Sequence, residues 1–142
     1  MYLFDTNVLS EVMKPTPHLA VAAWLEACPI DAMATAAICQ AEILYGIEKL
    51  PQGARRTRLE QAAHALFEQT FAGRILPFDK NAAATYARLR TTREQSGRPI
   101  TTEDAMIAAI ARAHTLTVVT RDTGGFTDCG IEIINPWRAT MG

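Results

Sequence analysis

The sequence has 142 residues, a formal net charge of −1 and 49% hydrophobic residues. This length and composition predict one globular domain, residues 1–142. The near-neutral net charge excludes a protein whose whole surface is strongly basic for nucleic-acid binding. No apolar stretch reaches membrane-spanning length and no signal peptide precedes the first strand-like segment, so we expect a soluble, cytoplasmic protein. The cysteines Cys28, Cys39 and Cys129 are too few and too irregularly spaced for a disulfide framework or a zinc cluster, and we expect reduced, packed thiols.

Hydrophobic periodicity and turn residues predict strands that alternate with helices. We expect a strand over 2–5, helices over 6–13 and 18–27, a small strand over 31–35, and helices over 37–50 and 54–71. A strand over 74–78, a helix capped by Asp79 and ending near residue 95, a helix over 102–114 and strands over 116–120 and 132–134 follow. Helical crossovers between strands imply a short parallel sheet covered on both faces, an α/β fold with three layers, α/β/α.

Four carboxylates stand where a purely structural acid is a poor choice. Asp5 and Asp122 follow two predicted strands, at the sheet edge where α/β proteins place their functional crevices. Glu42 and Asp104 fall within helices among mostly apolar neighbours, so we expect both to face the sheet. No Lys or Arg stands one helical turn from either acid, whereas a divalent cation would neutralise several acids together.

An all-oxygen site of this kind suits Mg²⁺, for which Mn²⁺ can substitute. A metal-activated water can attack a phosphodiester while a carboxylate accepts its proton, which leaves a 5′-phosphate and a 3′-hydroxyl. The sequence therefore predicts a metal-dependent phosphodiester hydrolase.

Each acid also has an ordinary structural interpretation. Asp5 is suited to cap the helix that follows it, Asp104 to form a capping box with Thr101, and Asp122 to start a turn. Glu42 could be a lone buried glutamate whose carboxylate is hydrogen-bonded to the backbone. Glu103, in the first turn of its helix, is better suited to interact with the helix dipole than to bind a metal. The joint occurrence of four acids at one edge favours a site.

Two other classes of acidic, metal-binding site need residues that this sequence lacks. A receiver-like signalling domain needs a lysine after a strand, and Lys14, Lys49 and Lys80 do not follow one suitably. A phosphatase of the haloacid-dehalogenase type needs an acid at position 7, which is Asn7. A non-catalytic, metal-binding or partner-binding module stays open as the alternative to an enzyme.

Four segments carry a family resemblance: Asp-Thr-Asn-Val-Leu at 5–9, Ala-Glu at 41–42, Thr-Glu-Asp-Ala-Met-Ile-Ala-Ala at 102–109 and Thr-Arg-Asp-Thr-Gly-Gly-Phe at 120–126. In order and spacing they resemble the successive motifs of PIN-domain ribonucleases. The chain is most similar to the VapC toxins of type II toxin–antitoxin systems and to their FitB branch. The resemblance covers nearly the whole chain, and it implies an Mg²⁺-dependent endoribonuclease silenced by a small antitoxin.

The resemblance also implies roles for individual residues. It makes four carboxylates the catalytic and metal-binding site, with the first two as principal ligands: Asp5, Asp104, Glu42 and Asp122. Thr6 and Thr120 would supply hydroxyls that orient the carboxylates or a phosphate. Many relatives have Asn at the position of Asp122 and an acid further on, where this chain has Gly125.

The implied partners are an RNA substrate, with transfer RNA as a candidate, a cognate antitoxin and a second copy in a homodimer. Two groups of arginines would suit RNA backbone contact, although solvated helix faces are the simpler and favoured explanation: Arg55, Arg56 and Arg58, then Arg88, Arg90, Arg93 and Arg98. We expect Trp24 and Trp137 in the core or an interface. A predicted apolar groove for the antitoxin, from which its arginine would enter the acidic pocket, comprises Tyr45, Ile47, Leu50, Leu59 and Leu66.

Overall fold

The computed structural model describes residues 1–138, so the last four residues of the expected domain lie outside the described range. Its sheet has the strand order β3-β2-β1-β4-β5, and all four pairings are parallel. The strands are β1 (Tyr2–Phe4), β2 (Met33–Ala36), β3 (Ile75–Leu76), β4 (Thr117–Val119) and β5 (Ile133–Ile134). The predicted parallel α/β fold is confirmed, with strands one to three residues shorter than expected because pairing ends where the turns begin.

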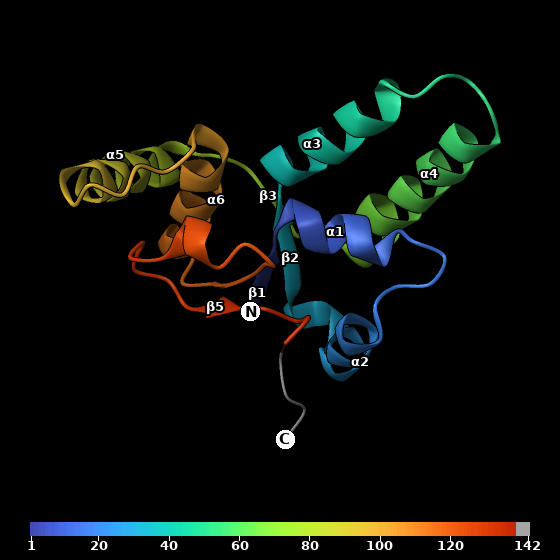
Figure 1. Cartoon of the computed structure of the whole chain (residues 1–142), viewed down its shortest axis with the longest axis horizontal. Helices are drawn as coiled ribbons and strands as arrows, with labels where there is room; N and C mark the ends of the chain where they lie inside the picture. The colour runs from blue at the N-terminus through green and yellow to red at the C-terminus, as the bar shows by residue number, and fades with distance from the viewer. Residues whose placement is uncertain (139–142) are drawn as a thin grey trace.

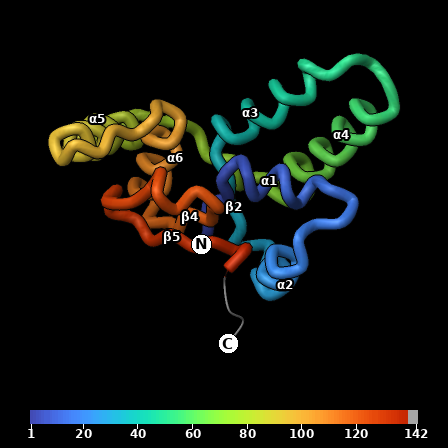
Figure 2. Tube along the Cα trace, in the orientation of Figure 1, coloured from blue at the N-terminus to red at the C-terminus, as the bar shows by residue number. Residues whose placement is uncertain are grey.

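Helices connect these strands in the predicted order. They are α1 (Thr6–Val12), α2 (Leu19–Ala27), α3 (Ala37–Glu48), α4 (Ala54–Ala65), α5 (Lys80–Gln95) and α6 (Thr102–Ala113). In Figure 1, α5 and α6 lie on one side of the sheet and α1 and α2 on the other, which gives the three layers. Helices α3 and α4 extend away from the sheet as a pair, visible along the traces in Figure 2.

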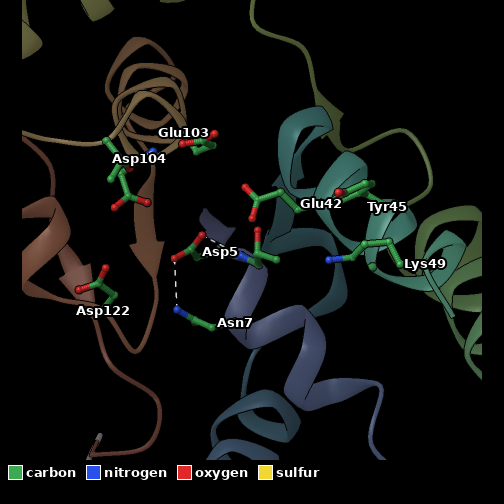
Figure 3. Close-up of a pocket in the computed structure, with 11 residues that line it drawn as sticks. Asp5, Asn7, Glu42, Tyr45, Lys49, Glu103, Asp104 and Asp122 are labelled. Atoms are coloured by element: carbon green, nitrogen blue, oxygen red, sulfur yellow. Dashed lines mark hydrogen bonds between the residues drawn. The ribbon is translucent and has the colours of Figure 1, made fainter.

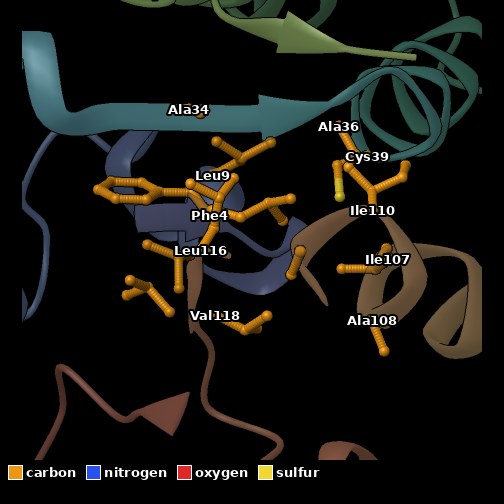
Figure 4. Packing of buried hydrophobic residues seen from close by; sticks show 14 of the residues in the cluster. Phe4, Leu9, Ala34, Ala36, Cys39, Ile107, Ala108, Ile110, Leu116 and Val118 are labelled. Carbon is orange, nitrogen blue, oxygen red and sulfur yellow. The ribbon is translucent and has the colours of Figure 1, made fainter. Parts of the chain in front are cut away.

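The core forms around the central strand β1. Leu3 and Phe4 are fully buried there, and the neighbouring strand β4 contributes Val118 and Val119. Figure 4 shows side chains from the sheet meeting those of α1, α3 and α6. This packing holds the ends of β1 and β4 next to one another, and these are the strands followed by Asp5 and Asp122.

Several expected boundaries differ from the structure. Asp31 lies in a 3₁₀ turn (Ile30–Ala32) before β2, and the expected helix over 54–71 ends in a turn of π-helix (Leu66–Thr70). Leu66 and Phe67 in that turn are buried, so core packing sets its geometry. All three cysteines are buried and unpaired, as expected. Trp24 packs on Tyr2 and Phe4. Among residues 1–138, none of the helices has the length and apolarity needed to cross a bilayer.

Candidate active site

Asp5 follows β1 directly and has both of the roles considered from the sequence. One oxygen, Oδ1, caps α1 by accepting a 2.8 Å hydrogen bond from the Thr6 N–H. The other, Oδ2, accepts a 2.7 Å hydrogen bond from the Thr120 hydroxyl. The residue is only 6% exposed, and its carboxylate lies at the centre of the group of acids in Figure 3. The helix cap therefore orients this carboxylate instead of replacing its role in a site.

Asp122 lies just beyond β4, the neighbour of β1, and is tied to the same hydroxyl. Its N–H donates to Thr120 Oγ1 over 3.0 Å, and its Oδ1 accepts from the Gly125 N–H over 3.2 Å, as in a turn. Asn7 completes the connection between the two strand ends. It donates to Thr120 Oγ1 and accepts from the Arg121 N–H. Asn7 is not among the predicted site residues, because an amide that bridges two strand ends has no local sequence pattern.

Asp104 lies in the first turn of α6 and is half-buried. Thr101 caps this helix by accepting a 3.1 Å hydrogen bond from the Asp104 N–H. Between Asp104 and Asp122 stands Gly125. A Cβ on this glycine would lie 2.6 Å from Asp122 Oδ2 and 2.9 Å from Asp104 Oδ2. The two carboxylates therefore face one another across space that a side chain at position 125 would need.

Glu42 extends from α3 toward the other acids (Figure 3), but it does so on an exposed face of the helix. The expectation that it faces the sheet is wrong. The buried face of α3 is formed by Cys39, Ile43 and Ile47, and Glu42 lies beside that face, exposed at the acidic pocket. Sequence periodicity indicates that the neighbours of Glu42 on the helix are apolar, but it does not show which of them are exposed to solvent.

All four predicted acids line one pocket of about 680 Å³. The pocket is also lined by Glu103, Tyr45 and Lys49, none of which is among the predicted site residues. Glu103 adds a fifth acid at the start of α6. Tyr45, expected in the apolar groove, instead lies at this pocket with the Lys49 ammonium 4.7 Å from its ring centre.

The acids raise one another's affinity for protons. Burial, and then the charges of Asp5 and Asp122, raise the pKa of Asp104 to about 6. Burial also raises the pKa of Asp5, against the lowering effect of the hydrogen bonds from Thr120 and Thr6. The pKa of Glu42 is raised by partial desolvation and then by Asp5, Glu103 and Asp104, against the lowering effect of the nearby Thr6 hydroxyl. Such shifts are expected where carboxylates converge without a counter-charge.

The donors fit a hard divalent cation. Among residues 1–138, none of the four acids forms an ion pair, although five other acids do. The Thr6 hydroxyl beside them is buried and has no hydrogen-bond partner in this part of the chain. No group of three or more acidic, His or Cys side chains among the described residues is arranged to hold a metal ion as it stands. Mg²⁺ does not need such a group, because it commonly keeps several waters and binds one or two protein carboxylates.

Comparison with known proteins agrees with this geometry. The family model of the PIN domain matches residues 2–130. The chain belongs to the PIN-domain family. It is 41% identical to toxin FitB of Neisseria gonorrhoeae, over 97% of this chain and 99% of the relative. It is 42% identical to VapC ribonuclease Y4jK of Sinorhizobium fredii, again over 97% and 99%. A solved structure of FitAB bound to a DNA fragment is similar with a TM-score of 0.92 and 39% identity, over 99% of this chain and 98% of that one.

A second pocket of this PIN domain, about 410 Å³, lies between α1, α3 and α4. Two predicted groove residues, Ile47 and Leu59, line it together with Met13 and Ile43. Leu66 does not, because it is buried in the π-turn. Leu50 does not line the pocket either, so the groove has an apolar base that differs from the predicted one, and Lys14, Arg55 and Arg58 give it a basic rim.

The two predicted groups of arginines contain both buried and exposed side chains in the structure. Arg56 is ion-paired with Glu48 and Glu60 and is 14% exposed, so it is not free for a ligand. Arg93 is 5% exposed, and for it both expectations, RNA contact and a solvated face, are wrong. Arg55, Arg58 and Arg88 remain exposed.

Proposed function

We propose that this PIN domain is a divalent-metal-dependent endoribonuclease and the toxin of a type II toxin–antitoxin pair. Mg²⁺ is the proposed cofactor, and Mn²⁺ can substitute. The observation that carries the proposal is the convergence of four carboxylates, from four separate elements, in one pocket without an ion-paired cation. Burial first, and repulsion between the acids second, raise the carboxyl pKa values in that pocket, and a cation would relieve the repulsion. Relatives named as ribonucleases support the reaction class.

Asp5 and Asp104 are the proposed principal ligands. Asp5 is held by hydrogen bonds to both of its oxygens, so it can bind an ion without losing side-chain entropy on ordering. Asp104 faces Asp122 across Gly125, and Asp122 completes the site at the end of β4. When bound, the cation would lower the pKa of a coordinated water and offset charge on the phosphate.

Glu42 is the proposed acceptor of the water's proton. It is exposed at the pocket, and its raised pKa brings a carboxylate nearer to the range in which a general base works. The water oxygen bonds to phosphorus as the P–O3′ bond breaks, Glu42 takes up the proton, and the 3′ oxygen leaves with a proton from solvent. The products are a 5′-phosphate and a 3′-hydroxyl.

The two pockets suit two partners. Lys49 at the acidic pocket, and Arg55 and Arg58 on the neighbouring rim, offer positive charge to an RNA backbone. The apolar base of the second groove suits an antitoxin segment, and solved relatives of this fold are toxin–antitoxin complexes. Because Glu42 and Thr6 line both pockets, an arginine of such a segment can reach the acids and pair with them. A homodimer and a transfer RNA substrate stay predictions of the family resemblance.

The test incubates purified, antitoxin-free protein with total RNA in Mg²⁺, in Mn²⁺ or in EDTA, and sequences the ends produced. We expect cleavage with either ion, none in EDTA, and 5′-phosphate ends. Equal cleavage in EDTA would rule out the metal, and millimolar Mn²⁺ binding without any cleavage would favour a non-catalytic module. Ends with a 2′,3′-cyclic phosphate would show that the 2′-hydroxyl, not water, is the nucleophile.

A further inference from the structure

Arg93 is a buried cation without a carboxylate partner. It lies on α5 and is 5% exposed, and no ion pair within residues 1–138 includes it. A buried charge is costly unless it is well hydrogen-bonded. Besides the Cys129 sulfur, 3.7 Å from a terminal nitrogen, its partners are backbone carbonyls, and they belong to two loops that are remote from one another in sequence.

The first loop joins α5 to α6. Arg93 Nε donates to the Arg98 carbonyl over 2.7 Å, and a terminal nitrogen donates to the Pro99 carbonyl over 3.3 Å. This loop leads directly to Thr101, which caps α6 at the N–H of Asp104. The guanidinium therefore fixes the backbone from which Asp104 extends.

The second loop follows β4. The other terminal nitrogen of Arg93 donates to the Gly125 carbonyl over 3.2 Å and to the Thr127 carbonyl over 2.7 Å. The N–H of the same Gly125 donates to Asp122 Oδ1. Gly125 thus accepts from Arg93 through its oxygen and holds Asp122 through its nitrogen.

We propose that Arg93 is a positioning residue of the acidic pocket, whose guanidinium joins the loop before α6 to the loop after β4 and so sets the separation between Asp104 and Asp122. A planar group with five donors is suited to this task, because it can bond to several fixed carbonyls at once. Lysine carries the same charge but presents its donors from a single atom. The inference rests on the proposed function in one respect, that the two carboxylates share a cation.

The test compares Arg93→Lys with Arg88→Lys, a substitution of the same type at an exposed position on the same helix. A second control, Arg98→Lys, changes the exposed ion pair with Asp128 that also spans the two loops. Two quantities are measured at a temperature where circular dichroism shows folded protein. They are amide hydrogen exchange over 96–104 and 121–129 without metal, and the dissociation constant for Mn²⁺ by electron paramagnetic resonance.

For Arg93→Lys we expect faster exchange confined to these two segments and Mn²⁺ binding weakened by about 10-fold or more, as for other residues that orient metal ligands. Both controls should keep wild-type values. Unchanged exchange, exchange that rises throughout the chain, or unchanged Mn²⁺ affinity would overturn the positioning role. If the lysine variant does not fold, Arg93→Gln takes its place, and failure of both to fold would assign Arg93 to the fold alone. Wild-type protein that binds no Mn²⁺ would instead overturn the proposed function, while the exchange data would still show whether Arg93 joins the loops.

Discussion

The Thr120 hydroxyl lies 2.7 Å from Asp5 Oδ2 and donates a hydrogen bond to it, which ties the end of β4 to the end of β1. The hydroxyl oxygen of Thr120 also accepts a hydrogen bond from the Asp122 N–H. Thr120 is fully buried, so water cannot take the place of this hydroxyl. One side chain therefore sets the positions of two acids on neighbouring strands.

Replacing Thr120 by Val should weaken Mn²⁺ binding about 10- to 100-fold, because the hydroxyl that orients Asp5 and Asp122 is lost. The matched control is Thr35→Val. Thr35 is also fully buried and donates to the Phe4 carbonyl over 2.8 Å, but it bonds to none of the four acids. Both variants should lose about 1–3 kcal/mol of unfolding free energy in urea. Equal Mn²⁺ affinities in the two variants would show that Thr120 serves the fold only.

Asp5→Asn and Asp104→Asn should each abolish RNA cleavage and leave the fold intact. Asparagine caps a helix about as well as aspartate, so α1 should still start at Thr6, and an amide in place of the Asp104 carboxylate keeps nearly the same shape. The control is Asp31→Asn, which removes one exposed charge from the turn before β2. Cleavage of labelled RNA and far-ultraviolet circular dichroism give the two readouts. Wild-type cleavage by both site variants would end the proposed mechanism.

The sequence was sufficient to predict the order of elements and the edge at which the acids meet. Asp5 and Asp122 follow apolar β-branched or aromatic runs, and parallel strands bring such positions to one edge whatever the details of packing. Asp5 and Asp122 lie close together because β1 and β4 are neighbours in the sheet, and no local sequence pattern predicts that strand order. Glu42 shows the limit of periodicity, since an apolar helix face need not be covered along its whole length.

Arg93 shows a different limit. Its side chain bonds to carbonyls of Arg98, Gly125 and Thr127, and a carbonyl is the same in every residue. A sequence therefore carries no pairing signal for it, unlike an ion pair between two charged residues. The π-turn after α4 has a similar origin, since burial of Leu66 and Phe67 decides where the α-helix stops.

The metal-free protein should be more stable near pH 5 than near pH 7.5. Asp104, with a pKa raised to about 6, and Asp5 and Glu42, also raised, bind protons more tightly when folded than when unfolded. Their contribution to stability is complete below the unfolded values and is lost as the pH rises through the folded ones. Saturating Mg²⁺ should reduce the difference in stability between the two pH values, because the cation takes the place of the protons bound to these carboxylates.

Melting temperatures at the two pH values, with EDTA or with Mg²⁺, measure this effect. The Asp104→Asn variant should show a smaller difference between the two pH values in EDTA. The chosen range avoids Glu11, whose pKa is lowered by its hydrogen bond with Lys14 and which would act in the opposite direction in stronger acid. A melting temperature that rises from pH 5 to pH 7.5 in EDTA would contradict the prediction.

Leu59→Glu should weaken binding of the cognate antitoxin by about 30-fold or more, because it places a charge in the apolar groove between α1, α3 and α4. RNA cleavage by the free protein should be unchanged, since Leu59 does not line the acidic pocket. The control is Leu19→Glu on α2, an 85% exposed leucine that does not line this groove. Isothermal titration calorimetry compares the variants. Equal losses for both would place the antitoxin on another surface.

Gly125→Ala should weaken Mn²⁺ binding and RNA cleavage about 10-fold or more, whereas Gly124→Ala should change neither. A Cβ at position 125 would lie 2.6 Å from Asp122 Oδ2 and 2.9 Å from Asp104 Oδ2, so both carboxylates must move. A Cβ at position 124 would meet nothing within 4 Å. Neither glycine has a positive φ, so backbone strain does not distinguish the two substitutions. Because the variants differ by one position in the same short turn, equal metal affinities would show that the spacing of Asp104 and Asp122 does not control the site.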